Sequence, residues 1–139
     1  MRIKRCAMLI VAFCVVATQA VGSIPITYFA LFDYGSAELT ETGRASVKDV
    51  VTEAKEALSQ TDAIVIYVSG YADRAGPEDF NMGLSKRRAE AIANALMAAG
   101  MERKYLEVSW HGEHELPIAT PDGVREQANR SVLLSVWGK

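Results

Sequence analysis

The chain has 139 residues, of which 50% are hydrophobic and 23% are charged, a composition typical of one compact domain. Its formal net charge is -2. A surface that binds nucleic-acid phosphates needs a basic excess, so this charge balance argues against a nucleic-acid partner.

The first 22 residues resemble a secretory signal peptide. Three basic residues precede an apolar run from residue 6 to residue 17, and small residues follow. Cleavage after Gly22 fits this pattern, and cleavage after Ala20 is the alternative. An uncleaved anchor is a further alternative, but the run is shorter than the roughly 20 residues of a spanning helix. We therefore expect a mature domain of residues 23–139 in the periplasm, with no membrane span.

Both cysteines, Cys6 and Cys14, lie inside the expected signal peptide. The mature chain would then contain no cysteine and could form no disulfide. Phe13 and Arg5 precede the two cysteines, whereas a lipidated cysteine follows small residues. The sequence thus argues against a lipid anchor.

Two strands and a helix are predicted in the first half of the mature chain. Residues 27–33 (TYFALFD) are aromatic and aliphatic and predict a strand, which turn-forming residues follow. Thr40 is a suitable N-cap for an amphipathic helix that ends near Gln60. Residues 63–68 (AIVIYV) are a continuous apolar run of strand length, which predicts a central strand covered on at least one face.

The second half continues the alternation. A helix is predicted over residues 77–99, because proline suits a first helical turn and a glycine follows its expected end. Residues 105–111 and 131–137 predict two more strands, with a short helical turn at 124–128. This order predicts a two-layer α/β sandwich, in which a mixed four-stranded sheet carries its helices on one face. The strand order does not follow from the pattern.

Residues 70–89 (GYADRAGPEDFNMGLSKRRA) place polar and apolar side chains on one helical stripe. At about 100° per residue, Asn81, Ser85 and Arg88 share a face with Ile92, which belongs to the predicted core. The first turns of this helix therefore point polar groups toward the body of the protein.

Arg88 then needs a partner, because a lone buried charge is costly. Asp73 is the available acid, just past the carboxyl end of the central strand, where ligands of α/β sheets tend to bind. Such a pair either forms a structural salt bridge or clasps a zwitterionic ligand. The residues alone leave both interpretations open.

The same stretch resembles the signature of the OmpA-like peptidoglycan-binding domain family. The matching positions are GYAD, Gly76, Asn81, Leu84-Ser85 and Arg88-Ala89. The similarity extends to the segments FDYGSAELT, GEHELP and NRSV, which together span nearly all of the mature chain. The chain departs from the family pattern at Ala72, where threonine is usual, and at Ser131, where a second arginine is common.

The resemblance implies non-covalent binding of peptidoglycan through the meso-diaminopimelate of the stem peptide, at the cell wall or the outer membrane. Arg88 would hold the ligand carboxylate and Asp73 its ammonium, a division that suits a planar guanidinium and a carboxylate. The resemblance implies no enzyme activity, cofactor or metal, and it allows other envelope proteins as partners. The further ligand-binding residues that it implies are Phe32, Asp33, Asn81, Leu84, Asn129 and Arg130.

Three alternatives remain. Asp73, Glu78 and Asp79 are candidates for the acid and base of a peptidoglycan hydrolase, although carboxylates are also typical of a helix N-terminus. The HGEHE segment, residues 111–115, contains residue types that bind zinc, but not in HExxH order. The third alternative is a periplasmic protein-interaction module in which the pair of Asp73 and Arg88 is only structural.

Overall fold

The fold is seen in a computed structural model that describes residues 25–138. The expected signal peptide, residues 1–22, lies outside the described residues. The described chain forms, in order, β1 (Thr27–Leu31), α1 (Glu41–Gln60), β2 (Ile64–Gly70), α2 (Glu78–Ala98), the 3-10 helix η1 (Arg103–Tyr105), β3 (Leu106–Trp110), the 3-10 helix η2 (Gln127–Asn129) and β4 (Ser131–Gly138).

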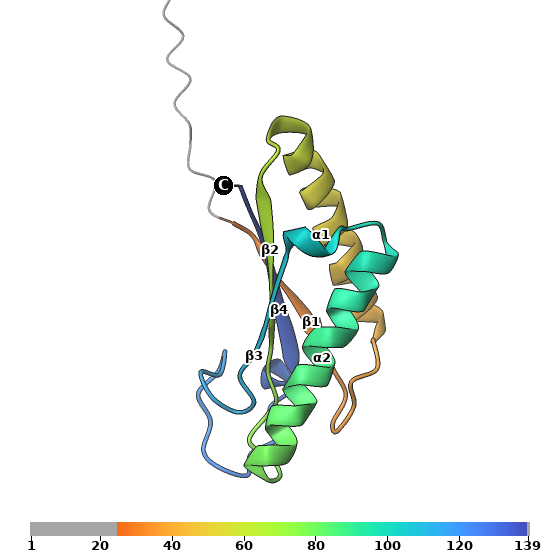
Figure 1. Ribbon diagram of the computed structural model, residues 1–139. Helices are drawn as coiled ribbons and strands as arrows, with labels where there is room; N and C mark the ends of the chain where they lie inside the picture. The colour runs from red at the N-terminus through yellow and green to blue at the C-terminus, as the bar shows by residue number, and fades with distance from the viewer. Residues whose placement is uncertain (1–24, 139) are drawn as a thin grey trace, which may run out of the picture.

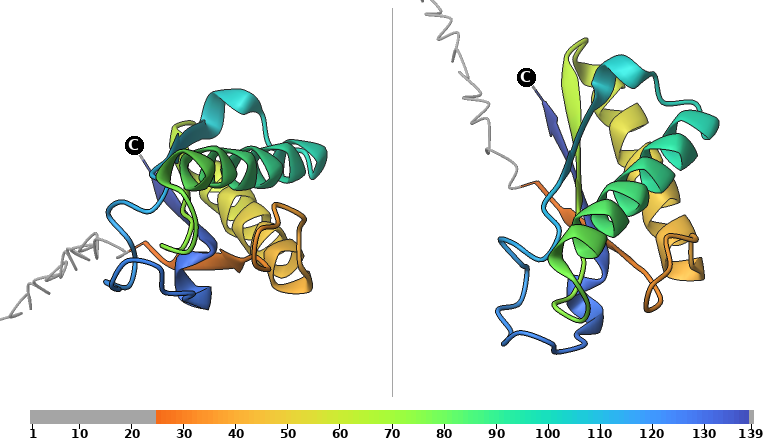
Figure 2. Two further views of the ribbon diagram at one scale, coloured as in Figure 1. Left: turned by 90° about the horizontal axis from the view of Figure 1, so that it is seen from below. Right: turned by 60° about the horizontal axis from the view of Figure 1, so that its bottom comes forward.

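The strands form one mixed sheet with the order β1-β4-β2-β3. The last strand, β4, lies between β1 and β2 and is antiparallel to both, whereas β2 and β3 are parallel. Both helices cover the same face of the sheet (Figures 1 and 2). The predicted two-layer sandwich, with a mixed four-stranded sheet and helices on one face, is confirmed.

The core lies between the sheet and the two helices. It is built from the helix-facing residues of the strands and the apolar stripes of the helices. In β2, Ile64, Ile66 and Val68 are all buried in this layer. None of the described helices is long and apolar enough to cross a membrane.

Both helices begin or end with a local signal that the sequence carries. Thr40 caps α1, since its hydroxyl accepts a hydrogen bond from Gly43 N at 3.2 Å. After α2, Gly100 has a φ of 102°, and the amide of Met101 donates to Leu96 O at 3.0 Å. Together with the bond from Gly100 N to Met97 O at 3.0 Å, this bond forms a Schellman motif, in which glycine is strongly preferred at the left-handed position.

Several predicted boundaries shift, and β2 runs to Gly70 instead of ending at residue 68. The strand predicted over residues 27–33 ends at Leu31, because its partner β4 begins at Ser131. Phe32 makes one more backbone bond, to Arg130 O at 2.8 Å. The helical turn predicted at 124–128 lies further along the chain, at Gln127–Asn129.

Gly70 allows α2 to pack closely on β2. A Cβ at Gly70 would lie 2.3 Å from the carbonyl oxygen of Ser85 and 3.0 Å from the Cβ of Ala89. We expect Gly70→Ala to lower the free energy of unfolding by roughly 1–3 kcal/mol, because a methyl group must push the helix away. Urea denaturation followed by circular dichroism measures this loss.

Gly83 provides the matched control in the same helix. A Cβ there meets only the mobile end of Arg87, at 3.3 Å. Gly83→Ala should therefore raise stability by about 0.5–1 kcal/mol, since alanine is the better helix former. Equal effects of the two substitutions would show that the close approach at Gly70 is unimportant.

Candidate functional site

Four segments meet at the carboxyl end of β2. They are the loop after β1, the loop between β2 and α2, the first turns of α2 and the long connection from β3 to β4, and they gather at one end of the molecule (Figure 1). The polar residues singled out from the sequence lie on these segments.

Arg88 is completely buried and connects α2 to the loop after β1 and the loop after β2 through backbone carbonyls. Its Nε donates to Ser36 O at 2.8 Å, its Nη1 to Tyr71 O at 3.1 Å and its Nη2 to Asp33 O at 3.1 Å. The guanidinium also lies 5.4 Å from the centre of the Phe32 ring. Three of its five N–H groups are thus used, and two are left for another acceptor.

Asp73 is also buried, but its ion-pair partner is Arg130. Asp73 Oδ2 accepts a hydrogen bond from Arg130 Nη1 at 3.1 Å, and Oδ1 accepts one from Ala75 N at 3.3 Å. Arg130 Nε donates to Phe32 O at 3.2 Å. The direct salt bridge between Asp73 and Arg88, one of the two interpretations from sequence, is not among the ion pairs of the described residues.

The buried cluster therefore contains two guanidinium groups and one carboxylate. The pKa of Arg88 is lowered to about 10, chiefly by burial and to a smaller extent by the charge of Arg130, while the charge of Asp73 acts in the opposite direction. Arg88 stays protonated at neutral pH, since that value is well above 7. The cluster of Asp73, Arg88 and Arg130 carries a net charge of +1, which an anionic ligand would neutralise.

The start of α2 supplies the other predicted polar residues. Asn81 is buried, and its Nδ2 donates to Glu113 Oε2 at 2.7 Å. Ser85 Oγ accepts a hydrogen bond from Gly112 N at 2.9 Å. Leu84 is buried beside them. These contacts attach the β3–β4 connection to the helix and so position the loop that closes the site.

The remaining predicted residues have three different roles. Phe32 is a core residue with 1% exposure, whereas Asp33 is exposed on the rim. Asn129 is fully buried, and its amide both donates to Ile118 O at 2.7 Å and accepts from Ile118 N at 2.9 Å. Its side chain thus pins the loop and has little capacity left for a ligand.

The sequence did not single out Arg74 as a rim residue. Its guanidinium pairs with Asp122 and donates to Thr120 O at 3.1 Å. It also lines an open cavity of about 300 Å³ together with Glu113 and His114. The one available signal for Arg74 was its position directly after Asp73. Its partners could not be predicted, because the loop that contacts it begins at Glu113, about 40 residues further along the chain.

The two histidines are paired with carboxylates of the rim. His111 Nδ1 lies 3.3 Å from Glu115 Oε2, and His114 Nε2 lies 2.6 Å from Glu78 Oε1. His111 also stacks on Tyr71, with ring centres 4.9 Å apart, and burial raises the pKa of that tyrosine. Among residues 25–138, no three side chains of histidine, aspartate or glutamate are arranged to hold a metal ion.

Sequence comparison identifies related proteins. The model of the OmpA family matches residues 31–130. An outer membrane protein of Gluconacetobacter diazotrophicus is 33% identical over 112 residues, which are 76% of this chain and 29% of that protein. Outer membrane protein A of Escherichia fergusonii is 31% identical over 100 residues, 70% of this chain and 40% of that protein. The chain thus spans less than half the length of these relatives.

Solved structures show the same fold. The peptidoglycan-associated lipoprotein of Burkholderia pseudomallei has a TM-score of 0.68 at 23% identity, over 79% of this chain and 90% of that chain. The OmpA-like domain of FopA1 from Francisella tularensis has a TM-score of 0.69 at 19% identity, over 82% and 73%. Since the family model also covers more than half of the sequence, this chain belongs to the OmpA family.

Proposed function

We propose that the domain binds peptidoglycan non-covalently in the periplasm, through the meso-diaminopimelate of a stem peptide. The observation that carries the proposal is the cluster of Asp73, Arg88 and Arg130, in which two guanidiniums accompany one buried carboxylate. Uncompensated buried charge is costly. A ligand carboxylate would compensate the buried guanidinium of Arg88, and an adjacent ammonium group would bind to Asp73.

Arg88 and Asp73 are the principal contacts in this proposal. Arg88 keeps two free N–H groups and holds the ligand carboxylate, while Asp73 keeps unused lone pairs for the ammonium. Because both side chains are buried, the ligand has to displace Arg130, whose side chain is 15% exposed and paired with Asp73. Asp33 then forms part of the entrance.

The proposed activity is binding without catalysis. Of the acidic residues considered for hydrolysis, Glu78 is hydrogen-bonded to His114, and Asp79 is exposed in the first turn of α2. Both positions suit the positive end of the helix dipole. Release of muropeptides from purified sacculi by this protein would contradict the proposal.

Names of related proteins support a place in the cell envelope. The curated relatives are outer membrane proteins, and one protein of the same fold is a peptidoglycan-associated lipoprotein. We infer that this domain lies in the periplasm and attaches to the wall, at or near the outer membrane.

The test is co-sedimentation of the exported protein with purified sacculi. We expect strong retention on sacculi that contain meso-diaminopimelate and at least tenfold weaker retention on sacculi that contain lysine at that position. Lysine keeps the ammonium but lacks the side-chain carboxylate, which forms a charge-assisted hydrogen bond of roughly 1.5–3 kcal/mol. Equal retention on both kinds of sacculi would exclude the diaminopimelate pocket.

A further inference from the structure

The two edge strands of the sheet differ in how their outer backbone groups are satisfied. On β1, the outward carbonyls of Phe29 and Leu31 accept hydrogen bonds from α1 and its cap. The hydroxyl of Ser46 reaches Phe29 O at 2.9 Å, and that of Thr40 reaches Leu31 O at 2.7 Å. Helix α1 thereby blocks this edge against another strand.

The opposite edge, β3, is blocked only at its start. His111 N donates inward to Gly70 O at 3.0 Å, and backbone groups of successive strand residues point to opposite edges. The backbone N–H and C=O groups of Leu106, Val108 and Trp110 therefore point away from β2, toward the open edge. Leu106 is already satisfied by Arg103, whose Nη1 donates to Leu106 O at 2.6 Å and whose carbonyl accepts from Leu106 N.

The N–H and C=O groups of Val108 and Trp110 thus remain free among the described residues. They offer four hydrogen-bonding groups in a row on an edge that has no proline, bulge or covering helix. An edge of this kind is a template for a strand from another polypeptide.

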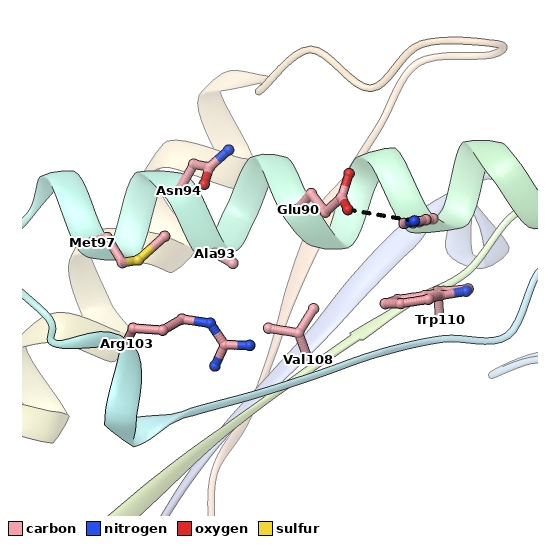
Figure 3. Close-up of a pocket in the computed structure, with 8 residues that line it drawn as sticks. Glu90, Ala93, Asn94, Met97, Arg103, Val108 and Trp110 are labelled. Carbon is pink, nitrogen blue, oxygen red and sulfur yellow. Dashed lines mark ion pairs between the residues drawn. The ribbon is translucent and has the colours of Figure 1, made fainter.

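A groove between β3 and α2 runs beside this free edge. It has a volume of about 590 Å³, and Figure 3 shows the helix on one side and the strand on the other, with their side chains between them. The indole of Trp110 is 41% exposed, and Met97 on the helix is 37% exposed. With Val108 and Ala93 they form an apolar floor.

The charges around the groove have a positive excess. Lys86 and Arg103 line it against the single acid Glu90. Lys86 lies 3.9 Å from Glu90 and 5.1 Å from the centre of the Trp110 ring, and its side chain is 49% exposed. An acidic group from a partner complements this rim.

We propose that β3 binds an extended segment of a partner protein as a fifth strand of the sheet. The segment pairs with the backbone of Val108 and Trp110. Its alternate side chains enter the groove, with apolar residues over the floor and an acidic residue beside Lys86. This docking edge is separate from the cluster of Asp73 and Arg88, so it can operate while the protein holds the wall.

The experiment uses the exported protein and an acetylated, amidated peptide of sequence Thr-Val-Thr-Asp-Thr-Val-Thr, which places two valines and the aspartate on one face. Amide hydrogen exchange by NMR is the measurement. At saturating peptide, exchange at Val108 and Trp110 should slow about tenfold or more, because free edge amides become hydrogen-bonded. Lys86→Glu should raise the Kd about fivefold, and the same peptide with lysine in place of aspartate should then bind better than the original.

Val108→Pro tests the backbone directly, since it removes an outward donor and no bond to β2. Val108→Pro should abolish peptide binding. If this variant does not fold, the Lys86→Glu variant still tests the proposal. Unchanged exchange at both amides would overturn the proposal. Protection that appears without peptide and grows with protein concentration would make a second copy the occupant. A response to N-acetylglucosamine oligomers and not to the peptide would make the groove a saccharide site, which also overturns it.

Discussion

Replacing Arg88 by lysine should lower the free energy of unfolding by about 3 kcal/mol and abolish retention on sacculi. Three backbone carbonyls, from Ser36, Tyr71 and Asp33, depend on the three nitrogens of one planar group. An ammonium is a compact charge and cannot reach all three. At least two of these carbonyls would lose a charged donor, and each such hydrogen bond is worth roughly 1.5–3 kcal/mol.

Arg87→Lys is the matched control for this change. Arg87 is the neighbouring arginine on α2, but it is exposed and lies over the Phe80 ring at 5.8 Å. Its replacement should alter stability by less than about 0.5 kcal/mol. Urea denaturation and sacculus co-sedimentation are measured on both variants at equal folded concentration. If Arg88→Lys matched the control in both assays, Arg88 would neither hold the loops nor hold the ligand.

Asp73→Asn has the second large effect, because Asp73 is the one carboxylate in the cluster with Arg88 and Arg130. Its side chain is 4% exposed and pairs with Arg130 at 3.1 Å. Removing one partner of a fully buried ion pair costs about 3–5 kcal/mol, and we expect the lower end of that range here because Arg130 is 15% exposed. Sacculus binding should fall below detection, because the ligand ammonium also loses its acceptor.

A double-mutant cycle separates the ion pair from general damage at the site. Arg130→Met removes the partner charge and keeps part of its aliphatic volume, so the double variant with Asp73→Asn avoids the unpaired guanidinium of Arg130. The sum of the two single losses in unfolding free energy should exceed the loss in the double variant by about 1–3 kcal/mol. Additive losses would mean that Asp73 and Arg130 do not interact in solution.

The elements and the family were predictable because both are encoded locally. The continuous apolar run of β2, the apolar period of α2, the cap at Thr40 and the glycine after α2 each act over a few residues of chain. The period of α2 also placed Arg88 on the buried face, and the spacing of the GYAD segment and Arg88 identified the family before any contact was known. The predictions of a signal peptide and of diaminopimelate binding remain predictions.

The hydrogen-bond and ion-pair partners of the charged side chains could not be predicted from the local sequence. Arg88 is held by the carbonyls of three residues, and every residue has a carbonyl, so no side-chain type marks them. Arg130 reaches Asp73 because β4 lies between β1 and β2, an order set by hydrogen bonds between segments about 60 to 100 residues apart. The same arrangement leaves β3 at the edge of the sheet, where the backbone groups of two described residues have no partner strand. Strand order, and not strand sequence, decides which backbone groups find a partner.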